Sequence, residues 1–520
     1  MDPARPWAQA VAWRDGIVIA VGDDDAVREV CDARTEVVDG SGGGVTPGLV
    51  DGHQHLFRGA VLAHGVDLAG AADLDEVRHR LWRGRGRLRD GEWLIARGLE
   101  YATLGDRAYH HQLLGDLDEG VPMLIWSFDL HTAYVNAAAL RAAAVTGERD
   151  LGDRSRIVCT DAGDPTGELR EWAAVDVVRD VAPDPAPDRL REWYREAIQA
   201  QNAVGLTGIH QMDGDGATVE LLRELDDSGD LRLRVWLYQF VYASTPDATV
   251  EAMVRGGRPA GRRWRADGIK IMLDGVIDTG TAWLERPDAC GQCRDAIWPD
   301  IDRFASRVRQ FHAAGLRVAT HAIGDRAVRA TLDAYAQCPG GSAGRHRIEH
   351  LETVPDGTAE RFARDEVTAS MQPIAMGWVA PDQSDPWSQR LDARRRAHGW
   401  RTGDLVDAGA VVVLGSDWPV GTFDPRHGLF AARERRAPGA ADPRPVGDTR
   451  GLTGLEALGG YTTGPARAVG AQGWSGRLAP GFAADLVLWA EDPADCPVTD
   501  VAELPVRLTV LAGDIVHSPV

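Results

Sequence analysis

The chain has 520 residues, 44% of them apolar, and 59 glycines, which is typical of a globular, loop-rich protein larger than one ordinary domain. Its formal charge of −21 argues against nucleic acid and anionic membrane surfaces as partners. Six cysteines are too few for a disulfide scaffold, no apolar run approaches the roughly 20 residues of a membrane span, and the first residues lack a signal pattern. We therefore expect a cytoplasmic protein.

Both ends of the chain are predicted to form short β-strands without intervening helices. Residues 8–21 alternate around an Arg14-Asp15-Gly16 turn, which is a hairpin signal, and residues 485–489 and 507–511 are strand-like. We expect a small β-sandwich domain formed by residues 1–47 and 475–520 together.

Eight strand-like runs occupy the middle of the chain. They cover residues 49–55, 206–212, 231–240, 268–274, 317–321, 346–351, 367–372 and 411–417. From the second run onward they alternate with helical patterns, which predicts an α/β fold, a (β/α)8 TIM-type barrel over residues 48–474. The gap after the first run is too long for one crossover. Residues 60–200 are therefore expected to be an inserted subdomain, with helices near 73–88 and 187–204 and a strand at 122–128.

Ionisable residues fall near the ends of these strands. His53 and His55 lie two residues apart in Val50-Asp51-Gly52-His53-Gln54-His55, so both imidazoles leave an extended strand on the same face. Further along the chain, the fourth, fifth, sixth and eighth strands carry Lys270, His321, His350 and Asp417. A TIM barrel places its chemistry at the C-terminal ends of its strands, so this set is the ligand inventory of a metal site.

Lys270 is the only lysine among 57 basic residues, and it lies in a strand flanked by apolar side chains. A protonated ammonium would be repelled by a divalent metal ion, and a neutral amine is an uncommon ligand at neutral pH. A lysine carbamylated by CO2 would instead be an anion whose two oxygens can bridge two metal ions, a role that arginine cannot fill. We take this modification as a hypothesis.

The sequence resembles the amidohydrolase superfamily, and within it the amidohydrolase-3 family of YtcJ-like and N-substituted formamide deformylase-like proteins. The motifs that carry the resemblance lie in residues 45–55, 129–136, 164–167, 270–282, 320–325, 347–350, 415–417 and 476–486, and so cover nearly the whole chain. The resemblance implies one metal ion on His53, His55 and Asp417, a second on His321 and His350, and a carbamylated Lys270 between them. Zinc is the metal that the resemblance and the histidine-rich set imply, most simply as two Zn²⁺ ions.

Four further residues have open roles. The resemblance suggests that His131 faces the substrate, although a local hydrogen bond near a helix start is the alternative. Trp418 flanks Asp417 and is expected to line the pocket. Asp325 is expected to cap a helix, and Glu349 is expected to point to the opposite face of its strand, away from the site.

These residues predict a metal-dependent hydrolase that cleaves a non-peptide C–N bond, in an amide or N-formyl amide, by a metal-bound hydroxide, with Asp417 as proton shuttle. A deaminase or cyclic amidase of the same superfamily is the alternative within hydrolases. A metal-binding protein without turnover is the alternative from another class. The expected partner is a small-molecule amide or formamide, with no nucleic acid and no membrane, and a homodimer stays open as the assembly.

Overall fold

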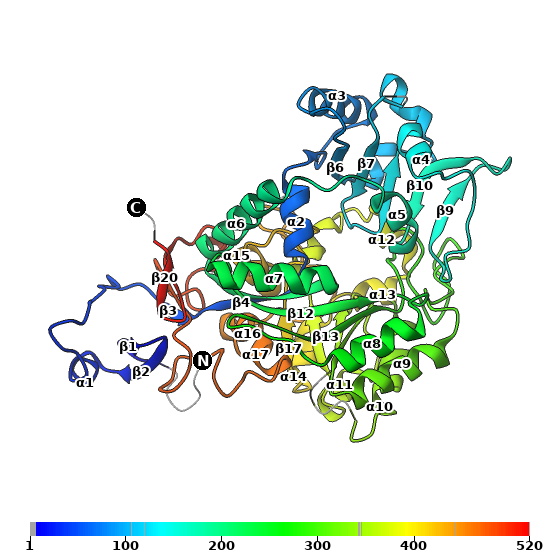
Figure 1. The fold of residues 1–520 in the computed structure, drawn as a ribbon. Coiled ribbons are helices and arrows are strands. Elements are labelled where there is room, and N and C mark those ends of the chain that lie inside the picture. The colour runs from blue at the N-terminus through cyan, green and yellow to red at the C-terminus, as the bar shows by residue number, and fades with distance from the viewer. Residues whose placement is uncertain are drawn as a thin grey trace.

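A computed structural model describes residues 7–518 except 106, 119, 342, 343, 345 and 441. Its central sheet has eight parallel strands whose spatial order is their order in the sequence (Figure 1). The strands are β4 (Leu49–Gln54), β11 (Leu206–Gly214), β12 (Arg234–Val241), β13 (Trp264–Met272), β14 (Arg317–Ala322), β15 (Arg347–His350), β16 (Thr368–Met371) and β17 (Val412–Leu414). The prediction of a (β/α)8 TIM-type barrel is confirmed.

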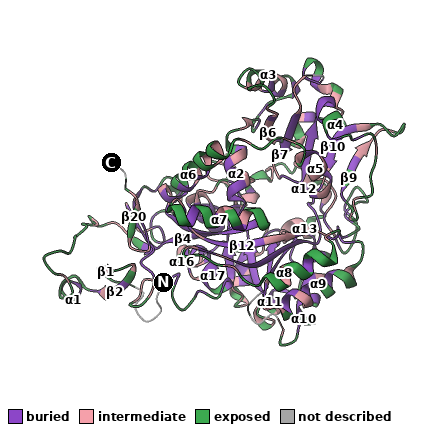
Figure 2. Cartoon of the chain, viewed as in Figure 1, coloured by how far each residue is buried: buried purple, intermediate pink, exposed green. Residues whose placement is uncertain are grey.

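The segment after β17 closes the barrel against β4. The amide of Asp417 donates to the carbonyl of His53 at 2.7 Å, and the amide of His55 donates to the carbonyl of Trp418 at 2.8 Å. Helices cover the outside of the barrel, with their buried faces inward and their exposed faces outward (Figure 2). They include α6 (Pro187–Ala203), α7 (Gly216–Ser228), α8 (Asp247–Gly256), α9 (Ile301–Ala313), α10 (Asp325–Ala336), α11 (Ala359–Arg364), α14 (Thr402–Asp407), α16 (Gly454–Tyr461) and α17 (Thr463–Ala468).

The sequence of α9 shows why these helices form and pack. Asp300 caps it by accepting hydrogen bonds from the amides of Asp302 and Arg303. Phe304, Val308 and Phe311 follow at helical spacing, and all three are fully buried against the barrel.

A six-stranded mixed sheet follows the first barrel strand and rises above the barrel in Figure 1. Its strands, in spatial order, are β5 (Val66–Asp67), β6 (Leu94–Leu99), β7 (Met123–Ser127), β8 (Thr132–Val135), β10 (Pro165–Arg170) and β9 (Arg156–Cys159). It has apolar clusters of its own and packs with α3 (Leu74–Arg85), α4 (Ala137–Ala142) and α5 (Trp172–Arg179). The sequence indicated one of these strands, and the sheet is larger than expected.

The two ends of the chain meet in antiparallel sheets. One sheet has the order β20 (Asp514–His517), β19 (Val506–Leu511), β18 (Leu486–Trp489) and β3 (Val45–Pro47), so it joins residues some 440 positions apart. The hairpin of β1 (Ala10–Arg14) and β2 (Ile17–Gly22) packs its apolar side chains against this sheet. The exact limits of the barrel, insertion and terminal units stay predictions. Among the described residues, no helix combines the length and the apolar character needed to cross a membrane.

Candidate active site

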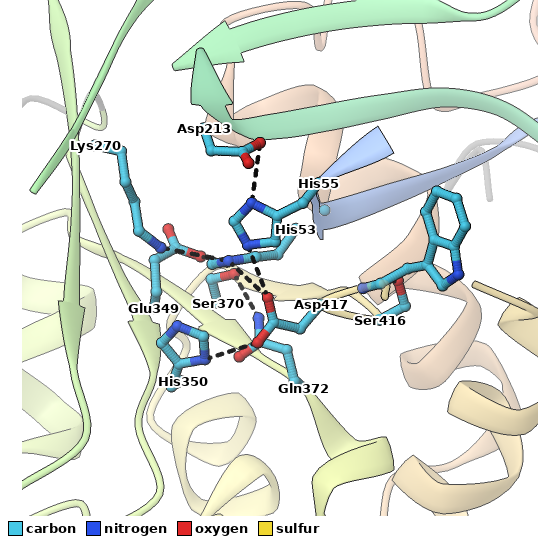
Figure 3. A network of polar contacts seen from close by, with 12 residues as sticks. His53, His55, Asp213, Lys270, Glu349, His350, Ser370, Gln372, Ser416 and Asp417 are labelled. Carbon is cyan, nitrogen blue, oxygen red and sulfur yellow. Dashed lines mark hydrogen bonds and ion pairs between the residues drawn. The ribbon is translucent and has the colours of Figure 1, made fainter. Parts of the chain in front are cut away.

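The C-terminal ends of the barrel strands bring together the residues that the sequence singled out. His53, His55 and Asp417 form the tightest group, because His53 Nε2 lies 3.3 Å and His55 Nε2 lies 3.1 Å from the same oxygen, Asp417 Oδ1 (Figure 3). Their ligand atoms are close enough together to hold one metal ion. Two imidazole nitrogens and a carboxylate are a donor set that suits zinc and similar divalent metals.

A carboxylate stands behind each of these two histidines. His53 Nδ1 lies 2.6 Å from Glu349 Oε2, and His55 Nδ1 lies 3.0 Å from Asp213 Oδ1. With a metal ion bound, a proton on each Nδ1 would face the carboxylate behind it, and each Nε2 would be free to bind the metal ion beside Asp417. The arrangement therefore presets the tautomer that a metal ligand needs, and the residues present fit a metal ion.

The backbone around Asp417 is shaped for close approach to β4. Asp51 accepts hydrogen bonds from the hydroxyl of Ser416 at 2.5 Å and from its amide at 3.0 Å. Gly415 leaves room, since a Cβ atom there would lie 2.5 Å from the amide nitrogen of His53. Asp417 has a φ of +57°, a strained conformation for a residue other than glycine and one often found at functional sites.

The electrostatics of Asp417 favour its ionised form. Burial acts to raise the pKa of this carboxyl, but the charge and hydrogen bond of His53, with the hydrogen bond from His55, more than offset burial and hold the pKa well below its usual value. Asp417 can thus act as an anionic ligand across the neutral pH range.

Lys270, His321 and His350 lie beside this first group. Lys270 is 2% exposed, and its Nζ is 3.3 Å from His53 Nε2. Burial lowers the pKa of this amine to about 8, although nearby carboxylates partly oppose the shift. His350 Nδ1 lies 3.8 Å from Asp417 Oδ2, and the His321 and His350 rings are 4.3 Å apart. The second group of predicted ligands thus adjoins the first.

His321 is oriented by the backbone of the β13–α9 loop. Its Nε2 lies 3.1 Å from the carbonyl of Gly275 and donates to it, so Nδ1 keeps its lone pair. Burial lowers the pKa of both His321 and His350 well below the usual value, which keeps both rings neutral. Neutral imidazole is the form that binds metal.

His131 comes from the insertion and reaches the barrel mouth. Its ring lies 5.2 Å from that of His321, and its Nδ1 lies 2.8 Å from Glu171 Oε2. Burial lowers the pKa of His131, but the charge of Glu171 outweighs burial and raises it to about 9. The partner of the ring is therefore 40 residues away in the sequence and not a local group, and the ring also lines the cavity in front of the proposed ligands.

That cavity lies between the barrel mouth and the insertion. Its wall contains the proposed ligands His321, His350 and Asp417, together with His131 and aromatic residues such as Phe128 and Trp378. Ser416 also lines it, whereas Trp418 is not among its described lining residues. The Trp418 ring instead packs against Phe423, with a centroid distance of 5.3 Å, and against Gly59. The expectation that Trp418 lines the pocket is therefore wrong.

Two other expectations from the sequence are corrected. Glu349 does not point away from the site, because it accepts a hydrogen bond from His53 and is held by both Nε and Nη2 of Arg347. Asp325 does not cap α10, since Gly324 holds the N-cap position. The Asp325 carboxylate instead accepts hydrogen bonds from the amide of Glu285 at 2.7 Å and from Arg395 at 3.0 Å.

Sequence reasoning missed Asp213 and Glu171, the carboxylates that orient His55 and His131. Asp213 immediately follows the predicted second strand, so the rule that located the other site residues at strand ends could have found it. Glu171 carries no such signal. It follows β10 of the inserted sheet, a strand that the sequence did not indicate.

Solved structures of the same fold carry the interpretation further. A metal-dependent hydrolase of uncharacterised function from Pyrococcus horikoshii OT3 aligns with a TM-score of 0.73 and 25% identity, covering 94% of both chains. The zinc complex of the atrazine chlorohydrolase TrzN from Arthrobacter aurescens TC1 aligns with a TM-score of 0.52 at 17% identity, over 98% of this chain and 90% of its own, and shares the fold. Fold and site together define a metal-dependent hydrolase.

Residues 36–517 match the amidohydrolase family, and the chain belongs to that family. The putative amidohydrolase YtcJ of Bacillus subtilis is 26% identical, with 98% of this chain and 96% of that protein covered. The N-substituted formamide deformylase of Arthrobacter pascens is 27% identical, with 99% and 95% covered. Protein LONG AFTER FAR-RED 3 of Arabidopsis thaliana is 26% identical, with 95% and 86% covered.

Proposed function

We propose that this protein hydrolyses a non-peptide C–N bond in an amide or N-formyl amide, using a binuclear divalent metal site. The observation that carries the proposal is the convergence of two histidines on one oxygen of Asp417, with Lys270, His321 and His350 beside them. The similarity to a formamide deformylase over nearly the full length of both chains supports this bond type.

His53, His55 and Asp417 would hold one metal ion, and His321 and His350 would hold the second. When bound, such ions, most simply Zn²⁺, supply Lewis acidity that lowers the pKa of water and polarises a carbonyl group. Glu349 and Asp213 fix the orientation of His53 and His55, so that little reorganisation is needed when the site is loaded.

Lys270 would join the two ligand groups as a carbamate. Its amine is buried beside His53, and a carbamate formed with CO2 would place two oxygens that share one negative charge where the amine alone offers one nitrogen. No other lysine exists in the chain to take this role.

Asp417 and His131 would handle the substrate. Asp417 Oδ2 would accept a proton from the attacking water and deliver it to the leaving nitrogen, so that the C–N bond breaks as the amine becomes neutral. His131, held by Glu171, would donate a hydrogen bond to the substrate from the cavity wall.

The test is a substrate panel on metal-reconstituted protein. The protein is loaded with zinc, its metal content is measured, and release of primary amine from N-substituted formamides and acetamides is followed. We expect turnover that a chelator abolishes and zinc restores. Two bound metal ions per chain with no turnover of any C–N substrate would contradict hydrolysis and favour a metal-binding protein without turnover.

A further inference from the structure

The wall of the cavity in front of the proposed metal ligands has an uneven charge. Besides Asp417, it contains the carboxylates Asp129, Asp278 and Glu352. None of the described lining residues is an arginine or a lysine, although the chain contains 57 such residues. Arginine is the usual partner of a carboxylate or phosphate on a ligand. The wall is therefore poorly suited to an anionic substrate.

Two of these carboxylates are already engaged within the protein. Asp129 accepts hydrogen bonds from the hydroxyl of Tyr101 at 2.8 and 2.9 Å and from that of Ser127 at 2.6 Å. Glu352 accepts one from the indole of Trp387 at 2.9 Å. Both therefore have structural roles besides facing the cavity.

Asp278 differs from them. Among the described residues, no side-chain hydrogen bond or ion pair reaches its carboxylate. The nearby Arg390 instead donates through Nε to the backbone carbonyl of Asp278, at 2.9 Å, and through Nη1 to Asp288, at 2.6 Å. Burial, with a smaller effect from Asp129, raises the pKa of Asp278 to about 7. The Arg390 guanidinium thus lies nearby but is paired with Asp288 and does not line the cavity, which leaves the Asp278 carboxylate for a ligand.

A second observation comes from the amide Gln372, which lines the same cavity. Its side chain is 3% exposed, and its Oε1 atom has no hydrogen-bond partner. A buried acceptor without a partner costs free energy unless a ligand supplies a donor. The aromatic rings of Phe128 and Trp378, 5.2 Å apart, add faces that attract cations.

We propose that the substrate is an amide whose amine portion carries an alkylammonium group in addition to the amide nitrogen. This positively charged group binds beside Asp278. The amide lies at the metal ligands, its N–H is available to Gln372 Oε1, and the cation occupies the acidic, aromatic wall. This proposal rests on the proposed C–N hydrolysis and names the substrate class of that site.

The experiment compares three formamides of matched length with the zinc-loaded protein. They are N-(4-aminobutyl)formamide, which is cationic, N-pentylformamide, which is neutral, and 5-formamidopentanoate, which is anionic. We expect kcat/KM to be highest for the cation and lowest for the anion. Asp278→Asn should reduce the ratio of cation to neutral kcat/KM at least tenfold. Asp227→Asn, which removes an exposed carboxylate from α7, should leave that ratio unchanged.

Direct binding separates this inference from the proposed function. By calorimetry, benzylammonium should bind the zinc-loaded protein at least tenfold more tightly than benzyl alcohol, and Asp278→Asn should remove that difference. Equal turnover of the neutral and cationic formamides would overturn the cation site and leave the hydrolysis standing. If no amide is hydrolysed, the proposed function fails, and the preference for benzylammonium alone decides the cation site.

Discussion

Two clusters of buried histidines lie at opposite ends of the barrel strands. One is the proposed metal centre at the C-terminal ends, and the other contains His312, Cys338 and His346, near the N-terminal ends of β14 and β15. Both clusters bring possible ligand atoms close together. They differ in what each ring nitrogen contacts.

In the second cluster the hydrogen bonds form a chain. His346 Nδ1 accepts from the amide of Val318 at 3.1 Å, so its Nε2 carries the proton and donates to His312 Nδ1 at 2.9 Å. His312 Nε2 then donates to the carbonyl of Pro339 at 3.1 Å. Each ring nitrogen is occupied, and this cluster is expected to be structural. At the mouth, Glu349 and Asp213 contact the rear nitrogens of His53 and His55, and both Nε2 atoms face Asp417, the third proposed ligand of the same metal ion.

The largest expected effect comes from Lys270→Arg. A guanidinium cannot form a carbamate, so this variant should lose the second metal ion and essentially all turnover. Metal content per chain and amine release measure both effects. With 13C-bicarbonate, the unmodified protein should show a metal-dependent carbamate signal that the variant lacks. Near-normal turnover of Lys270→Arg would rule out the carbamate.

Asp417→Asn should keep the fold and most of the metal, because the amide retains one oxygen. It should lower kcat by about 10²–10⁴-fold, the usual contribution of a positioned proton-transfer group. Unchanged rates in steady-state kinetics would remove Asp417 as the proton shuttle.

Asp213→Asn tests the carboxylate behind His55. Loss of this acceptor should weaken metal affinity roughly 10–100-fold, as is typical for groups that orient a metal ligand. Titration with a competing chelator measures the affinity, and added zinc should restore most of kcat. Such rescue separates a positioning role from a general loss of structure.

The sequence located the ligands because a simple geometric rule holds at the strand ends. Side chains at the C-terminal ends of β4, β14 and β15 face the barrel mouth wherever the strands are regular. The prediction that Glu349 points away from the site was wrong because period-two alternation assumes an extended backbone. His350 has a φ of +73°, so the chain turns and both neighbours reach the site. Asp278 and Glu171 were not predicted from the sequence because a loop positions Asp278 and the insertion positions Glu171.

His312→Asn tests whether the second histidine cluster is structural. It should leave metal content and kcat unchanged, because His312 lies outside the mouth. Breaking a buried hydrogen-bond chain should destabilise the fold by about 1–3 kcal/mol, which thermal unfolding measures as a lower Tm. A loss of bound metal in this variant would mean that the second cluster also holds an ion.

The smallest effect on stability is expected for Asp278→Asn, and its size depends on pH. The pKa of Asp278 rises from 3.8 to about 7 on folding, so the folded chain binds the proton more tightly than the unfolded chain. Stability from this group therefore falls as pH rises from about 4 to about 7, and stays low above that range. The variant should unfold about 1–3 °C above the unmodified protein at pH 8, and this difference in Tm should narrow at pH 5.

The control is Asp227→Asn, which changes the net charge by the same amount and should show no such pH-dependent difference in Tm. A gap that widened toward pH 5 would mean that the Asp278 carboxylate has a stabilising partner, and the mouth would then resemble the hydrogen-bonded cluster at the other end of the barrel.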